Sequence, residues 1–217
     1  MKPGRLTGTH ASWSKGAAFT MIELLTVIAI IGILAAILIP SVSSAKAAAN
    51  RAKTRVQFNQ WAAAVAAFRG EYGYYPLFDV SNLVNGGADA VNHPFHDVLA
   101  GHQRDGSALT AGSSSATQNK KLISFIVFSE SDFTNADSAT PGLLHEAFGA
   151  TEIAVLVDRN LDGVINSSDY GASLPAVGGI RPDATEFPAT GVRAGCVFYC
   201  ALPGATTVAP QFIFSWQ

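Results

Sequence analysis

A single carboxylate, Glu23, lies inside an apolar run near the start of the chain. The run extends from Phe19 to Ile39, and the residues after Glu23 are almost all Leu, Ile, Val and Ala. About 21 helical residues span roughly 30 Å, which matches the hydrocarbon thickness of a bilayer. A charge in such a span is costly unless it finds a partner. Glu23 is therefore a candidate functional residue in a predicted transmembrane helix over residues 19–39.

The second candidate site is a segment rich in oxygen donors, residues 158–169. Its spacing fits a twelve-residue calcium loop, with side-chain oxygens at positions one, three and five, glycine at six and a carboxylate at twelve. The expected Ca²⁺ ligands are Asp158, Asn160, Asp162, the backbone carbonyl of Val164, Asn166 (directly or through water) and Asp169. Because Asp-Gly also marks tight turns, a plain hairpin turn at residues 161–164 is the alternative.

The other reactive residue types form no enzyme signature, so we do not expect catalysis. The sequence has no phosphate-binding loop, no nucleophile elbow and no paired His ligands. Histidines at positions 93, 96, 102 and 145 fall in polar segments and are expected to be solvated. Cys196 and Cys200 lie about 13 Å apart if the strand is extended, too far for a disulfide. Two buried free thiols are expected, unless the chain bends between them.

A long helix must carry the first candidate site. The helical pattern continues past Pro40, because residues 45–69 are rich in Ala, Lys, Arg and Gln. Apolar residues recur there at spacings of three and four and form one stripe: Phe58, Trp61, Val65, Phe68 and Tyr72. Glycine at 70 and 73 and proline at 76 then end the helix. The sequence predicts one helix over residues 19–72, apolar in its first half and amphipathic in its second.

The remainder of the chain, residues 73–217, is predicted to form a globular head. Residues 79–117 read as loop, with one short helix at Pro94–Leu99. The predicted strands, all rich in β-branched and aromatic residues, are Leu122–Phe128, Ile153–Val157, Cys196–Leu202 and Gln211–Trp216. Short strands after one long helix indicate an α+β fold with a small antiparallel sheet.

The start of the chain resembles the amino terminus of the type IV pilin and type II secretion pseudopilin superfamily. The resemblance rests on a basic leader, Met1–Ala18, and on the run Phe19-Thr20-Met21-Ile22-Glu23; Pro40 lies where the family often has a helix-kinking proline. It implies that prepilin peptidase removes residues 1–18 by cutting between Ala18 and Phe19, and that Phe19 is then methylated. The family usually has Gly before the cut, where this chain has Ala18.

The same resemblance implies a role for Glu23. In a growing filament, its carboxylate would neutralise the amine of Phe19 in a neighbouring subunit. Two charges that are each costly in lipid would then form a pair whose Coulomb energy grows as the dielectric constant falls. The implied protein has one span in the bacterial inner membrane and a periplasmic head. A membrane assembly platform would move it into a helical filament in the periplasm or at the cell surface.

The head resembles that of major-type pseudopilins more diffusely. The segments that carry the likeness are Leu99-Ala100-Gly101, Asn119–Phe125, Ala147-Phe148-Gly149 and the Asp-rich loop, in the family's order. The implied function is that of a type II secretion pseudopilus subunit that supports protein export. A type IV pilin for adhesion, motility or DNA uptake is one alternative. Another is a secreted calcium-binding recognition domain that begins at Lys46, after an ordinary signal peptide.

Charge gives a further constraint. The full chain has fourteen Lys and Arg against sixteen Asp and Glu, and three of the cations belong to the leader. The processed chain is therefore acidic, which argues against nucleic acid as its main partner. Four cations follow the apolar run: Lys46, Arg51, Lys53 and Arg55. They are expected on a solvated helix face or opposite acids of neighbouring subunits.

Overall fold

The computed structural model describes residues 19–89, 92–135 and 142–216, and these form an α+β fold, as predicted. The helices are α1 (Met21–Tyr72), α2 (Pro94–Ala100), α3 (Ser114–Gln118), α4 (Ser167–Tyr170) and a 3₁₀ turn at Glu130–Asp132. The strands are β1 (Ile153–Val157), β2 (Cys196–Ala201) and β3 (Phe212–Phe214). The chain divides into two compact units, Met1–Lys46 and Ala47–Gln217, and the boundary falls within α1.

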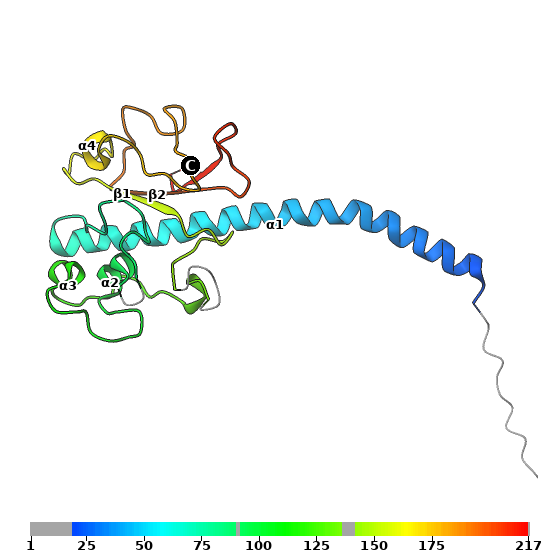
Figure 1. Ribbon diagram of the computed structural model, residues 1–217, viewed down its shortest axis with the longest axis horizontal. Helices are drawn as coiled ribbons and strands as arrows, with labels where there is room; N and C mark the ends of the chain where they lie inside the picture. The colour runs from blue at the N-terminus through cyan, green and yellow to red at the C-terminus, as the bar shows by residue number, and fades with distance from the viewer. Residues whose placement is uncertain (1–18, 90–91, 136–141, 217) are drawn as a thin grey trace, which may run out of the picture. The chain divides into compact units, whose positions relative to one another are not determined.

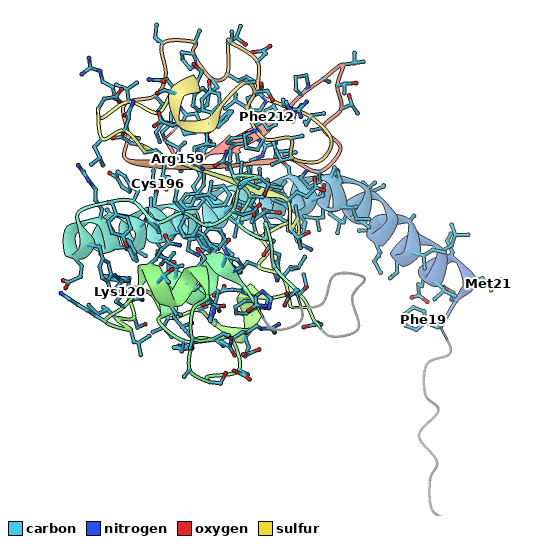
Figure 2. The ribbon with its side chains drawn as sticks, turned by 60° about the vertical axis from the view of Figure 1, so that its left-hand side comes forward. Phe19, Met21, Lys120, Arg159, Cys196 and Phe212 are labelled. Carbon is cyan, nitrogen blue, oxygen red and sulfur yellow. The ribbon has the colours of Figure 1, made fainter. Side chains whose placement is uncertain are left out.

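In the first unit, the described residues from Met21 onward belong to α1. Side chains project outward along this part of the helix (Figure 2), and its large apolar residues, at positions 21–42, are exposed. Among the described residues, α1 is the one helix that is long and apolar enough to cross a membrane. A helix that is apolar all round and unburied in its own chain needs an apolar surrounding.

In the second unit, α1 supplies the centre of the head. Figure 1 shows this part of the helix between the β1–β2 sheet on one side and α2 and α3 on the other. The predicted apolar stripe is confirmed, because Phe58, Trp61, Val65 and Phe68 are buried and Tyr72 packs, half-buried, against the same core. The Trp61 ring lies 5.3 Å from that of Phe95 in α2 and 5.6 Å from that of Phe198 in β2. Edge-to-face aromatic packing therefore joins the helix to both neighbouring layers.

The sheet is antiparallel, with the order β1-β2-β3. Both of its faces are covered, because all five residues of β1 are buried. Val155 and its alternate neighbours pack in the cluster that contains α1, and Leu156 packs in a second cluster with Phe187 and Tyr199. This burial on both faces explains why β1 reads as a continuous apolar run rather than an alternating one.

Three of the four predicted strands are present, and the last is shorter than expected. The prediction of a strand at Leu122–Phe128 was wrong. Leu122 has a positive φ of 52°, and the Phe125 N–H donates to the carbonyl of Leu99 in α2 rather than to a strand. Phe125, Ile126 and Phe128 pack, partly buried, against the core that contains α1, whereas Val127 is exposed. Partial burial without strand pairing therefore accounts for the apolar residues at 125, 126 and 128. The short helix predicted at Pro94–Leu99 is confirmed as α2.

Candidate functional sites

The first candidate site is at the start of α1. Thr20 precedes the helix, and its hydroxyl accepts a hydrogen bond from the Glu23 N–H at 3.3 Å. One carboxylate oxygen of Glu23 accepts from the Thr20 N–H at 2.8 Å and from the Thr20 hydroxyl at 2.7 Å. This reciprocal pattern is a capping box, which satisfies N–H groups that the first turn of a helix leaves without partners.

The capping box gives Glu23 a contact within its own subunit. Thr20 was not predicted as its partner, although the spacing Thr-x-x-Glu is the known signal for this motif. Glu23 is exposed, so its second carboxylate oxygen is accessible for another partner. Phe19 lies next to Thr20 and is also exposed, whereas Ala18, on the other side of the expected cut, lies outside the described residues.

The second candidate site, residues 158–169, folds onto its own backbone. Asp158 is 1% exposed, and its two oxygens accept from the Asp162 N–H at 3.1 Å and the Gly163 N–H at 2.9 Å. Asp162 in turn accepts from the Val164 N–H at 2.8 Å and from the Asn160 side-chain amide at 3.0 Å. The positive φ of Gly163, 83°, is the conformation that glycine supplies at the sixth position of such a loop.

Asp169 closes the loop from the other end. Its oxygens accept from the Arg159 N–H at 2.8 Å and from the Asn166 N–H at 3.0 Å. Asn166 caps α4 and accepts from the Ser168 N–H at 2.8 Å. Together, Asp158, Asp169 and Asn166 connect both ends of the predicted calcium loop through hydrogen bonds, and Asp169 is buried like Asp158.

The plain-hairpin alternative for residues 161–164 is wrong. The chain does not return along β1 after Gly163 but enters α4, and the partner of β1 is β2, beginning at Cys196. The oxygen donors of the loop are of the type that calcium prefers. Among the described residues, however, no group of three or more His, Cys, Asp or Glu side chains is gathered closely enough to hold a metal.

A small pocket borders the Asp-rich loop. It has a volume of about 390 Å³ and is lined by Arg69, Tyr75, Asp158, Asp162 and Arg193, among others. Arg69 in α1 donates to the Tyr75 hydroxyl at 3.2 Å, and its guanidinium lies over the Tyr75 ring. Burial raises the pKa of Tyr75 above its ordinary value. The two arginines place positive charge beside the carboxylates of the loop.

A third polar site, which the sequence analysis missed, connects α1 to the head. Glu146 is 1% exposed and accepts from the Thr54 hydroxyl of α1 at 2.8 Å. It also accepts from the N–H groups of Phe148 and Ala150, each at 2.9 Å. A lone Glu in a loop gave no signal of this role, because the helix residue that completes it is 92 positions away.

The histidines and cysteines have structural positions. The expectation that all histidines are solvated was wrong for two of them: His93 and His96 are buried, and His96 contacts the Asp97 carboxylate at 3.0 Å. Burial lowers the pKa of His93 below its ordinary value. Cys196 and Cys200 are both free, as predicted, but only Cys200 is buried, whereas Cys196 is half-buried. Burial raises the pKa of both thiols. Figure 2 shows Cys196 at the sheet.

A long helix, apolar in its first half, whose second half packs on a small antiparallel sheet defines a pilin-like architecture. Residues 13–39 match the family model described as the prokaryotic N-terminal methylation motif. The motif indicates a membrane-anchored, type IV pilin-like protein that prepilin peptidase processes and that assembles into pilus-like filaments. No curated protein and no solved structure matches the chain at a significant level.

Proposed function

We propose that this protein is a structural subunit of a type II secretion pseudopilus-like filament that supports protein export. The observation that carries the proposal is the methylation motif, with Glu23 at the first turn of an exposed apolar helix. Before assembly, the subunit is anchored in the inner membrane with its head in the periplasm, and the assembly platform moves it into the filament. A type IV pilin for adhesion, motility or DNA uptake is the second candidate, because the same motif supports it.

In this proposal, Glu23 exchanges partners during assembly. In the free subunit its carboxylate caps α1 through Thr20. In the filament it would neutralise the amine of Phe19 in a neighbouring subunit, which removes two isolated charges from a medium of low dielectric constant. The capping contact positions the carboxylate at the helix terminus, near the level at which a neighbour's amine enters the membrane.

Two substitutions separate the capping role from the charge. Glu23→Ala removes both, whereas Glu23→Gln keeps a side-chain oxygen that can cap the helix and has no charge. We expect both variants to be processed and inserted in the membrane, and neither to assemble into filaments. The measurements are cleavage of the leader, membrane fractionation and electron microscopy of filaments. Normal filaments from Glu23→Gln subunits would assign the role of Glu23 to capping and refute the charge pairing.

Two further experiments distinguish the candidate functions. Amino-terminal sequencing of the mature protein should find methylated Phe19; a chain beginning at Lys46 would instead support a secreted recognition domain. Deletion of the gene should abolish export of secreted proteins if the filament belongs to a secretion system. Loss of surface pili, motility or DNA uptake with export intact would favour the pilin.

We also propose that the Asp-rich loop binds Ca²⁺ through Asp158, Asn160, Asp162, the Val164 carbonyl, Asn166 and Asp169. The support is the spacing of the oxygen donors and the burial of Asp158 and Asp169, whose carboxylate oxygens accept hydrogen bonds from backbone N–H groups of the same loop. When bound, the ion would supply positive charge to these carboxylates and fix the loop. No catalytic role is attached to it.

The test is a thermal melt of the full chain in detergent, with calcium and with chelator. At a hundredfold excess over Kd, binding to the folded state adds about 2.7 kcal/mol, which should raise Tm by several degrees. Asp162→Ala should abolish the difference. Asp183→Ala, which removes an exposed carboxylate that accepts hydrogen bonds within its own turn, is the matched control and should keep it. Equal Tm values for the unsubstituted chain in both buffers would refute the metal site.

A further inference from the structure

A basic segment of α1 remains without an assigned partner. Lys46, Arg51, Lys53 and Arg55 all fall within about ten residues, and all four side chains are exposed. Among the described residues, the ion pairs are His96–Asp97, Arg104–Glu130 and Lys121–Glu71, so none includes a cation of this segment. Four exposed like charges repel one another and favour an anionic partner.

The helix itself supplies no such partner. From Leu24 to Gly70 the sequence contains no Asp or Glu, so no carboxylate lies three or four positions from any of the four cations. Helices of soluble domains commonly alternate the two charges along an exposed face, which stabilises them through such pairs. The absence of acids over this stretch leaves the whole segment positive.

The segment follows directly after the apolar part of α1. Lys46 comes seven residues after Ile39, the last residue of the apolar run, and both belong to the first compact unit. Seven helical residues rise about 10 Å. The headgroup layer adds about 5–7 Å to each side of the hydrocarbon core, and a lysine side chain can extend back toward it. Arg51, Lys53 and Arg55 follow five, seven and nine residues later along the chain.

We propose that this basic segment binds the anionic headgroups of phospholipids in the bilayer that holds the unassembled subunit. The inference rests on the membrane anchoring in the proposed function and adds a lipid class to it. The phosphates of an anionic bilayer surface present negative charge at the place where the helix leaves the hydrocarbon core, and their attraction acts over roughly one Debye length, about 8–10 Å. Such contacts would hold the subunit at the membrane surface until assembly removes it.

A second copy of the chain is the competing partner. Residues 71–217 contain six Lys or Arg and fifteen Asp or Glu, so the head is acidic. The observations favour lipid because the basic segment is continuous with the span and because headgroups surround every inserted subunit before any neighbour docks. Binding to a second copy is therefore an outcome that the experiment must be able to reveal.

The experiment uses the full chain in phosphatidylcholine vesicles that contain a trace of spin-labelled phosphatidylglycerol or spin-labelled phosphatidylcholine. Flotation first shows insertion, so failure of the anchor is distinguished from failure of the lipid contact. We expect the protein to immobilise labelled phosphatidylglycerol in preference to phosphatidylcholine, by up to roughly five-fold per contributing cation at low salt. The preference should fall when 0.5 M salt is added, because salt screens the attraction.

Matched double variants locate the contact. Lys46→Gln/Arg51→Gln should reduce the preference several-fold at low salt, since two cations are lost. Lys120→Gln/Arg181→Gln removes two exposed cations of the head, of which Figure 2 labels Lys120, and should leave the preference unchanged. An unsubstituted protein that immobilises both lipids equally refutes the proposal. So does a basic-segment variant that keeps the lipid preference and loses only crosslinking between subunits, which would assign the segment to a second copy.

Discussion

The contact between Thr54 and Glu146 offers a direct test of how the head is attached to its helix. The Thr54 hydroxyl of α1 donates to the buried Glu146 carboxylate at 2.8 Å, and the Ala147 N–H donates to the same hydroxyl at 3.3 Å. Thr54→Val removes the hydroxyl and keeps the shape, because both side chains are β-branched at the same positions. The substitution therefore leaves one buried carboxylate oxygen with fewer donors and little change in packing.

The expected effect follows from the burial of both groups. Thr54 is fully buried and Glu146 is 1% exposed, so no water replaces the lost donor. A hydrogen bond to a buried charged group contributes about 1.5–3 kcal/mol, and the loss of one partner costs a similar amount. For a head of this size each kcal/mol changes Tm by about 2–4 °C. We therefore expect Tm to fall by roughly 3–12 °C.

The assay is thermal unfolding of the full chain in detergent, followed by near-ultraviolet circular dichroism. Thr117→Val is the matched control, because Thr117 is exposed and its hydroxyl donates to the carbonyls of Ser113 and Ser114 at the start of α3. Its Tm should change by about 1–2 °C at most, as for a surface substitution. If Thr54→Val melts within the range of the control, the contact does not stabilise the attachment of α1 and the reasoning fails.

Two further predictions concern single positions. Gly101→Ala should destabilise the head by at least about 1 kcal/mol, because Gly101 has a φ of 75° and a Cβ there would lie 2.8 Å from the carbonyl of Leu122. Gly70→Ala should instead stabilise the head by about 0.5–1 kcal/mol, because Gly70 lies inside α1 and a Cβ there would point into open space. Denaturant melts of both variants measure the two changes in the free energy of unfolding. Cys200, which is buried, should resist a thiol reagent at pH 8 in the folded protein and react after unfolding. Because burial raises the pKa of both thiols in the folded state, only the unfolded state loses the thiol protons as pH rises above about 8.5, so Tm should decline from that pH upward. Rapid labelling of Cys200 in the folded protein would contradict its burial.

At residues 158–169, the local spacing predicted the loop, whereas the tertiary structure determined how its carboxylates are buried. The sequence predicted a loop with glycine at the sixth position, and Gly163 has the required positive φ. The sequence did not reveal that Asp158 and Asp169 are buried acceptors of backbone N–H groups. Those contacts depend on β1 delivering Asp158 to the interior, which a local pattern cannot specify.

The strand predictions differ for a similar reason. β1 and β2 were predicted correctly because both are short apolar runs bounded by turn residues, and their composition suits a buried sheet. Leu122–Phe128 has the same composition but no strand partner, and it packs beside α1 instead. β-Propensity measures how well a residue fits a half-buried surface, so it cannot distinguish strand pairing from burial against a helix.

The sequence by itself determined the long helix and its two halves, because a continuous apolar run and a three-four spacing of aromatic residues are local patterns of one element. It also located Glu23, since a lone carboxylate in an apolar run needs no tertiary information to be recognised. Only the tertiary structure decided that Glu146 accepts a hydrogen bond from the Thr54 hydroxyl and that His93 and His96 are buried. These features join residues far apart in the chain or depend on which surface the fold covers, and no local pattern encodes either.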